Sequence, residues 1–217
     1  IVAGNLGLNT RFHATEKAPL GLFAPDFDHD GRLDPILALA ESGNYYPAIQ
    51  REFLATQLPS IKKKFTRNTP FANATLIDIF SAKELLAGTC LEAKTMETMW
   101  FKNEQGKFTR QSLPDYAQFS STEKILVADF TADGIPDILT LGNEYGMEVE
   151  SYQLDASDGF VFRGNGQGNF SSAPMRVGAF GEVRDAAILH LKSGKKVLLV
   201  ANNDAPVQIF NLPSSKN

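Results

Sequence analysis

The sequence predicts a mainly β fold of repeated antiparallel sheets, because three short patterns recur along its 217 residues. An aspartate-rich loop between two apolar runs occurs at Asp26–Asp34 and again at Asp129–Asp137. A strand end rich in glycine and asparagine and a glycine-containing hairpin also recur, in a similar order. Hairpins that recur along the chain at intervals of about one propeller blade favour a β-propeller over a β-sandwich. We therefore expect a partial β-propeller of about three blades, each an antiparallel four-stranded sheet.

The glycine- and asparagine-rich patterns locate the expected strand ends and turns. Both residue types readily adopt the positive φ values that tight turns between antiparallel strands require. A last hairpin is expected after the second aspartate loop, and it keeps only Asp185 of the aspartate pattern. The strand ends are Val2–Gly7, Leu141–Gly146 and Val200–Asn203, the hairpins are Phe101–Phe108 and Phe162–Phe170, and the last hairpin joins Val183–Leu191 to Val197–Ala201.

Residues 47–88 interrupt the repeats and are expected to form a helical insertion within one blade. Ile49, Phe53 and Leu54 are spaced to share one face of a helix. Prolines within the segment divide it into short helices. We expect its apolar residues to cover the edge of a single propeller fragment that spans residues 1–217. A functional role for it stays open, because long insertions are often functional.

The first aspartate loop has the composition of a calcium site. Calcium prefers roughly six to eight oxygen ligands, and carboxylates at alternate positions of a tight loop can converge on one ion. Gly31 allows the sharp turn. Without a cation, four neighbouring carboxylates would repel one another. The predicted ligands are the side chains of Asp26, Asp28, Asp30 and Asp34 and the backbone carbonyl of Arg32.

The second aspartate loop carries a weaker version of the same pattern. Thr131 replaces the middle carboxylate, which lowers the negative charge available to a cation. An alternative is an Asx-type turn in which the aspartates accept hydrogen bonds from backbone N–H groups. Magnesium fits both loops less well because it demands strict octahedral geometry. Zinc is not expected either, because His29 is the one histidine nearby and is expected to point outwards. The predicted ligands are Asp129, Thr131, Asp133 and Asp137, with the carbonyl of Ile135.

Together these loops resemble the calcium loops of the FG-GAP/VCBS repeat family. Both read D-F-x-x-D-G-x-x-D between apparent strands, whereas an EF-hand needs flanking helices and a glutamate at position 12, where Leu37 and Thr140 stand. The resemblance covers most of the chain outside residues 47–88 and is closest to bacterial secreted or surface proteins with tandem VCBS repeats. It implies a structural Ca²⁺ at a loop between the first two strands of a blade.

Composition argues against several classes of partner. A net charge of −4 and a pI near 5.4 make nucleic-acid binding a poor fit. The basic run Lys62–Lys64 has a simpler explanation at the C-terminus of a helix. No apolar run reaches the roughly 20 residues that would insert this segment into a membrane. A single cysteine, Cys90, allows no internal disulfide. The start at Ile1 suggests a fragment or a processed product.

Two classes of function remain open. The first is a calcium-stabilised module outside the cell or at its surface (the periplasm or outer membrane included) that mediates adhesion by binding a protein or a glycan, without catalysis. The alternative is a polysaccharide hydrolase or lyase with its active site in the propeller channel, since one fold hosts many activities. No nucleotide, zinc or hydrolase motif is present. About three blades cannot close a ring, so further blades, a homodimer or the helices must cover the open edges.

Overall fold

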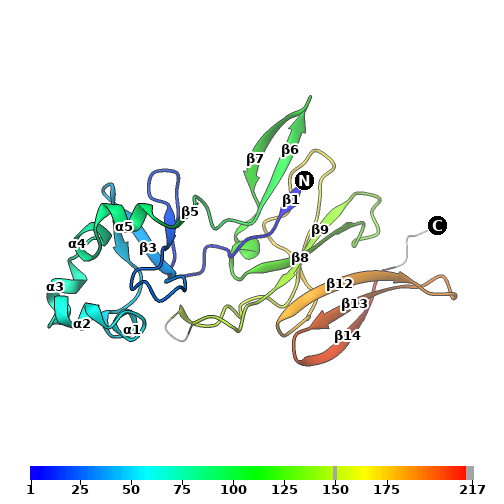
Figure 1. Cartoon of the computed structure of the whole chain (residues 1–217). Coiled ribbons are helices and arrows are strands. Elements are labelled where there is room, and N and C mark those ends of the chain that lie inside the picture. The colour runs from blue at the N-terminus through cyan, green and yellow to red at the C-terminus, as the bar shows by residue number, and fades with distance from the viewer. Residues whose placement is uncertain (149–150, 214–217) are drawn as a thin grey trace. The chain divides into compact units, whose positions relative to one another are not determined.

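The computed structural model describes residues 1–148 and 151–213 and divides the chain into two compact units (Figure 1). One unit is Phe12–Thr95, and the other joins Ile1–Arg11 to Met96–Asn217. The described strands form four antiparallel sheets, which confirms a mainly β fold. Two of these sheets have four strands and two have three, so the expected four-strand pattern holds for half of them. No described helix is long and apolar enough to cross a bilayer.

The unit Phe12–Thr95 is built on one four-stranded sheet. Its strand order is β4-β3-β2-β5, and β2 pairs antiparallel with both β3 and β5. The chain therefore returns to the edge beside β2 only after the helices have passed. Residues 26–34 connect β2 to β3 and hold the first aspartate loop. The strands are β2 (Leu20–Ala24), β3 (Ile36–Glu41), β4 (Asn44–Pro47) and β5 (Thr89–Ala93).

Five short helices lie between β4 and β5, in the segment predicted to be helical. Helices of four to seven residues are not stable alone in water, so packing against the sheet must hold them. Thr75 and Ser81 each begin a helix with a capping box, which satisfies N–H groups that the helix cannot. The helices are α1 (Arg51–Gln57), α2 (Ser60–Lys64), α3 (Asn68–Ala72), α4 (Leu76–Ile79) and α5 (Ala82–Leu86).

The helices and one face of their sheet share a single apolar core. Leu54 is fully buried and packs with Phe23 and Ala38 of the sheet. Leu58 continues the same stripe one helical turn later. The expected position of Phe53 on this face is wrong: its side chain is 47% exposed, because a neighbouring residue on a helix is rotated by about 100°.

The second unit contains three sheets. Their strand orders are β1-β6-β7, β11-β10-β9-β8 and β12-β13-β14. The strands are β1 (Val2–Ala3), β6 (Met99–Glu104), β7 (Lys107–Ser112), β8 (Thr122–Ala128), β9 (Asp137–Gly142), β10 (Phe160–Phe162), β11 (Met175–Arg176), β12 (Val183–His190), β13 (Lys196–Asn202) and β14 (Ala205–Asn211), and a 3₁₀ helix spans Asp115–Gln118.

The sheet β8–β11 is covered on both faces. Leu139 and Leu141 of β9 pack with Leu198 and other residues of the sheet β12–β14. Ile138 packs on the opposite side in a cluster that includes Trp100 of β6. All six residues of β9 are buried, so its burial does not alternate along the strand as it would in a sheet with one face in solvent.

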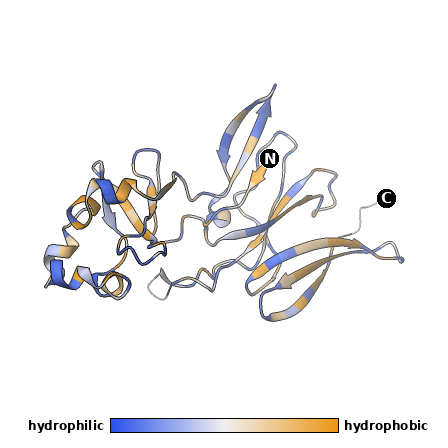
Figure 2. Cartoon of the chain, in the orientation of Figure 1, coloured by the Kyte–Doolittle hydropathy of each residue, from blue (hydrophilic) through white to orange (hydrophobic). Residues whose placement is uncertain are grey.

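The outer sheets are more exposed than this central sheet. Every residue of β7 is exposed, and most of the hairpin β6–β7 is hydrophilic (Figure 2). One face of the sheet β12–β14 is different, because it presents apolar side chains to solvent. Val207 is 59% exposed and Ile209 is 67% exposed. Leu189 on β12 is 42% exposed.

Two glycines of the repeated strand ends serve close backbone approach and not the expected turns. A Cβ atom on Gly142 would overlap the carbonyl oxygen of Ser121, and a Cβ atom on Gly4 would overlap that of Thr122. Both contacts lie where one strand end meets the start of β8. The adjacent Asn143 takes the positive φ instead, at 102°.

We predict that Leu54→Ala lowers the free energy of unfolding by about 2–5 kcal/mol, because it empties a fully buried site between helix and sheet. Phe53→Ala, next to it on α1, should cost much less since that ring is half exposed. Urea unfolding followed by circular dichroism measures both. Equal losses would contradict the described packing of α1.

Candidate metal centre

The first aspartate loop forms a closed turn between β2 and β3. The N–H of Asp34 donates to the carbonyl of Pro25 at 2.8 Å and closes the loop. His29 and Gly31 have positive φ values of 61° and 89°, which fold the loop back on itself. His29 is exposed. Asp34 is 7% exposed, so one carboxylate of the loop lies inside the protein surface.

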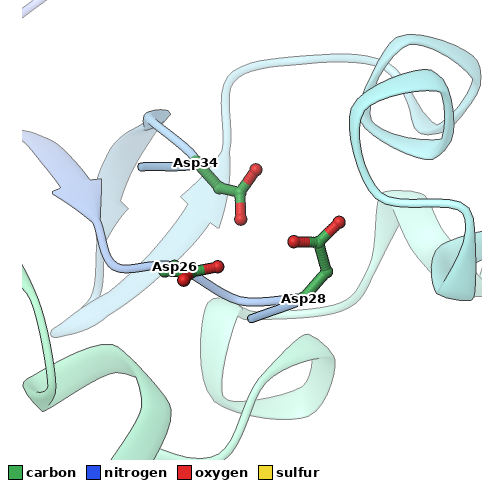
Figure 3. A group of neighbouring side chains, drawn as sticks. All are labelled: Asp26, Asp28 and Asp34. Carbon is green, nitrogen blue, oxygen red and sulfur yellow. The ribbon is translucent and has the colours of Figure 1, made fainter. Parts of the chain in front are cut away.

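Three carboxylates of this loop converge. Asp26, Asp28 and Asp34 each offer an oxygen, and these oxygens lie within 4.8 Å of one another. Figure 3 shows the three carboxylate groups facing a common space. Carboxylates this close repel one another unless a cation lies between them. An all-oxygen group of this kind suits a hard cation such as Ca²⁺.

Backbone N–H groups hold these carboxylates in place. Asp26 accepts hydrogen bonds from Asp30 at 3.1 Å and Gly31 at 3.0 Å, and Asp28 accepts one from Asp30 at 3.1 Å. Asp34 accepts a hydrogen bond from the N–H of Phe27 at 2.8 Å. The loop therefore presets the carboxylates, because these bonds fix the position of each group.

The side chain of Asp34 also receives a donor from the helical insertion. Nε2 of Gln57, the last residue of α1, lies 3.3 Å from Oδ1 of Asp34. This neutral amide orients the carboxylate without cancelling its charge. Among the described residues, no ion pair reaches Asp26, Asp28 or Asp34.

The structure does not bring Asp30 into the converging group. Its Oδ1 accepts the N–H of Arg32 at 2.8 Å in an Asx-type turn. Arg32 is exposed, and its carbonyl ligation stays a prediction. Asp30 as a ligand also stays a prediction.

The second loop uses its aspartates to hold backbone N–H groups. Asp129 accepts hydrogen bonds from Asp133 at 3.1 Å and Gly134 at 2.9 Å, as Asp26 does in the first loop. The convergence found at Asp26–Asp34 does not occur at Asp129–Asp137 within the described part of the chain. The hydroxyl of Thr131 is buried and makes no described hydrogen bond.

Asp137 is fully buried and its carboxylate accepts three backbone hydrogen bonds. Oδ2 accepts from Phe130 at 2.9 Å and Thr131 at 3.0 Å, and Oδ1 accepts from Gly164 at 3.0 Å. Both oxygens are therefore occupied by protein donors. This residue ties the loop to the segment after β10.

Asp133 makes an ion pair. Nε and Nη2 of Arg163 lie 2.8 and 2.7 Å from its Oδ2, and the N–H of Ile135 donates to Oδ1 at 2.9 Å. The hydrogen bond from Ile135, together with the weaker effect of the Arg163 guanidinium, lowers the pKa of the Asp133 carboxyl. The carboxylate thus stays charged, with a protein cation beside it.

A separate polar cavity of about 500 Å³ lies beside Glu182 in the second unit. Glu182 is 5% exposed and accepts hydrogen bonds from the N–H of Tyr145 at 3.0 Å, from Arg184 at 2.6 Å and from Asn203 at 2.7 Å. The Tyr145 bond, with that of Asn203, lowers the pKa of the Glu182 carboxyl. A carboxyl that stays ionised is poorly suited to act as a general acid.

Sequence reasoning did not find this cavity, although three of its residues lie in the repeated strand ends. Tyr145 and Gly146 belong to Leu141–Gly146, and Asn203 belongs to Val200–Asn203. Both strand ends reach Glu182, which precedes β12.

Comparisons with protein-family models, with curated proteins and with solved structures find no match to this chain. The resemblance to FG-GAP/VCBS repeats therefore rests on the residues of the two loops.

We predict that, in a chelator, Asp137→Asn lowers the free energy of unfolding by about 1–3 kcal/mol, because an amide cannot accept all three buried N–H bonds. Asp34→Asn should cost less, since its amide oxygen can still accept from Phe27 and repulsion with Asp26 and Asp28 is relieved. Urea unfolding of both variants measures the difference. A larger loss for Asp34→Asn would contradict the described roles.

Proposed function

We propose that this chain is a calcium-binding β-propeller module of a secreted or cell-surface protein, which binds a protein or a glycan and catalyses no reaction. The observation that carries the proposal is the convergence of Asp26, Asp28 and Asp34 with no protein cation beside them among the described residues. A divalent ion would remove the repulsion among these carboxylates.

The donor set supports calcium over other metals. All three converging groups are carboxylates, and loop carbonyls such as that of Arg32 supply further oxygens. Zinc favours nitrogen and sulfur ligands, and magnesium demands a strict octahedron that an irregular loop does not offer. Calcium tolerates a flexible set of oxygens. The ion's role would be structural, because it would fix a loop that joins two strands.

The arrangement of strands supports the propeller. Each aspartate loop joins the first two strands of an antiparallel meander, β2-β3-β4 in one unit and β8-β9-β10-β11 in the other. The sheet β8–β11 is packed on both faces by other sheets, as the blades of a propeller are. The exposed apolar face at Val207 and Ile209 favours a further sheet against β12–β14, from more blades or from a second copy.

The polar cavity beside Glu182 favours a binding module over an enzyme. Its buried carboxylate is occupied by three donors that tie together separate segments. A glycoside hydrolase needs one carboxyl that can give up a proton near neutral pH. Glu182, with its lowered pKa, does not fit that role. Exposed loops beside the sheets are the natural places for recognition.

We predict that calcium raises the melting temperature of the whole chain, because an ion that binds only the folded state stabilises it by about 2.7 kcal/mol at one hundred times its Kd. Asp28→Asn should lose most of this rise since it removes one converging carboxylate. Asp155→Asn, an exposed carboxylate in the other unit, is the matched control and should keep the rise. Scanning calorimetry in calcium and in chelator measures it. Identical melting curves in both buffers would count against the site.

We also predict that binding of a glycan or protein partner depends on calcium and yields no product. Wild-type chain and Asp28→Asn are applied to a glycan array and to a panel of surface proteins, with calcium and with chelator. Retention by the wild type in calcium alone supports a calcium-dependent binding module. Release of shortened or unsaturated sugars from bound polysaccharide would overturn it in favour of a hydrolase or lyase.

A further inference from the structure

We propose that the Arg163 guanidinium is the built-in cation of the second aspartate loop, so that this loop keeps its shape without metal and the chain binds calcium at the first loop alone. Calcium binding at the first loop rests on the function proposed above. The role of Arg163 rests on its own contacts.

The Arg163 guanidinium supplies the positive charge that a metal ion would otherwise bring to this loop. Arg163 comes directly after β10, and two of its guanidinium nitrogens lie 2.7 and 2.8 Å from Oδ2 of Asp133. The other oxygen of Asp133 accepts the N–H of Ile135. A metal ion at Asp133 would lie against this positive guanidinium, and like charges repel, so Asp133 binds no ion unless Arg163 withdraws.

The neighbouring residue, Gly164, binds a second acid of the loop, Asp137. Its N–H donates to Oδ1 of Asp137, whose other oxygen accepts from Phe130 and Thr131. A Cβ atom on Gly164 would overlap the carbonyl oxygen of Pro136, so this close approach requires glycine. Arg163 and Gly164 thus satisfy two of the three aspartates of the loop. Thr131 in place of a fourth carboxylate lowers the charge that must be balanced.

The first loop lacks such a cation because Arg51, the arginine that corresponds to Arg163, makes its contacts elsewhere. In the pairing of β9 with β10, Ile138 lies opposite Phe162, which puts Arg163 beside Asp137. Continuing the pairing of β3 with β4 beyond Ala38 and Pro47 would put Arg51 beside Asp34.

The chain leaves the sheet before that point, because α1 begins at Arg51. The guanidinium of Arg51 donates to Asn68 at 2.6 Å, to the carbonyl of Phe65 at 2.9 Å and to Glu52 at 2.9 Å. The helical insertion thereby draws the arginine away and supplies the neutral Gln57 to Asp34 instead. This gives the insertion a role in keeping the first loop open to a metal.

The test is the number of calcium ions bound, measured by isothermal titration with CaCl₂ up to about ten times the millimolar Kd of extracellular calcium modules. We expect one ion for the wild type, two for Arg163→Gln, none for Asp28→Asn and one for the double variant. Arg67→Gln is the matched control, because it removes one exposed positive charge from the other unit and should leave one ion. Circular dichroism checks that each variant is folded.

The modes of failure are distinguishable. Two ions on the wild type would overturn the role of Arg163, as would one ion on both the wild type and Arg163→Gln. No ion on the wild type but one on Arg163→Gln would overturn the proposed function of the first loop and support the role of Arg163. No ion on either would overturn both.

Discussion

The structure depends on how negative charge is balanced in two tight loops between paired strands. Each loop needs aspartates, because a short carboxylate is the group that can accept the N–H bonds of a turn folded this sharply. The same aspartates repel one another once they are close. Asp26, Asp28 and Asp34 converge with only neutral donors described around them, whereas Asp133 has Arg163. The proposed difference in metal binding between the loops arises from that contrast.

These loops also fix how the sheets are built. Asp137 is the first residue of β9, and its buried carboxylate joins the end of β8, the start of β9 and the segment after β10. The register of three strands is therefore set at one residue. Because β9 is buried on both faces, a shift of this register would misplace Ile138 and Leu139 in two different cores.

Much of the fold could be predicted from the sequence, since repeated loops and turns carry local signals. The strands beside Asp26–Asp34 and the hairpin Phe101–Phe108 lie where those signals put them. The strand order around β5 could not be predicted, because it depends on where the chain returns after the helices. The role of Gly142 was also hidden, because the need for a missing Cβ atom arises from a contact with Ser121 and not from its own turn.

The candidate site shows the same limit. Residue spacing identified the acids of both loops, but their partners come from distant positions. Arg163 lies 30 residues after Asp133, and Gln57 lies 23 residues after Asp34. Composition within each loop therefore cannot separate converging carboxylates with neutral donors from an aspartate paired with an arginine. What distinguishes the two loops is the segment that follows the third strand of each sheet. After β10, the pair Arg163-Gly164 lies beside Asp137. After β4, helix α1 begins at Arg51 and turns the guanidinium of that residue away. Two loops of nearly the same sequence thus acquire different partners for their aspartates from the segments that follow them.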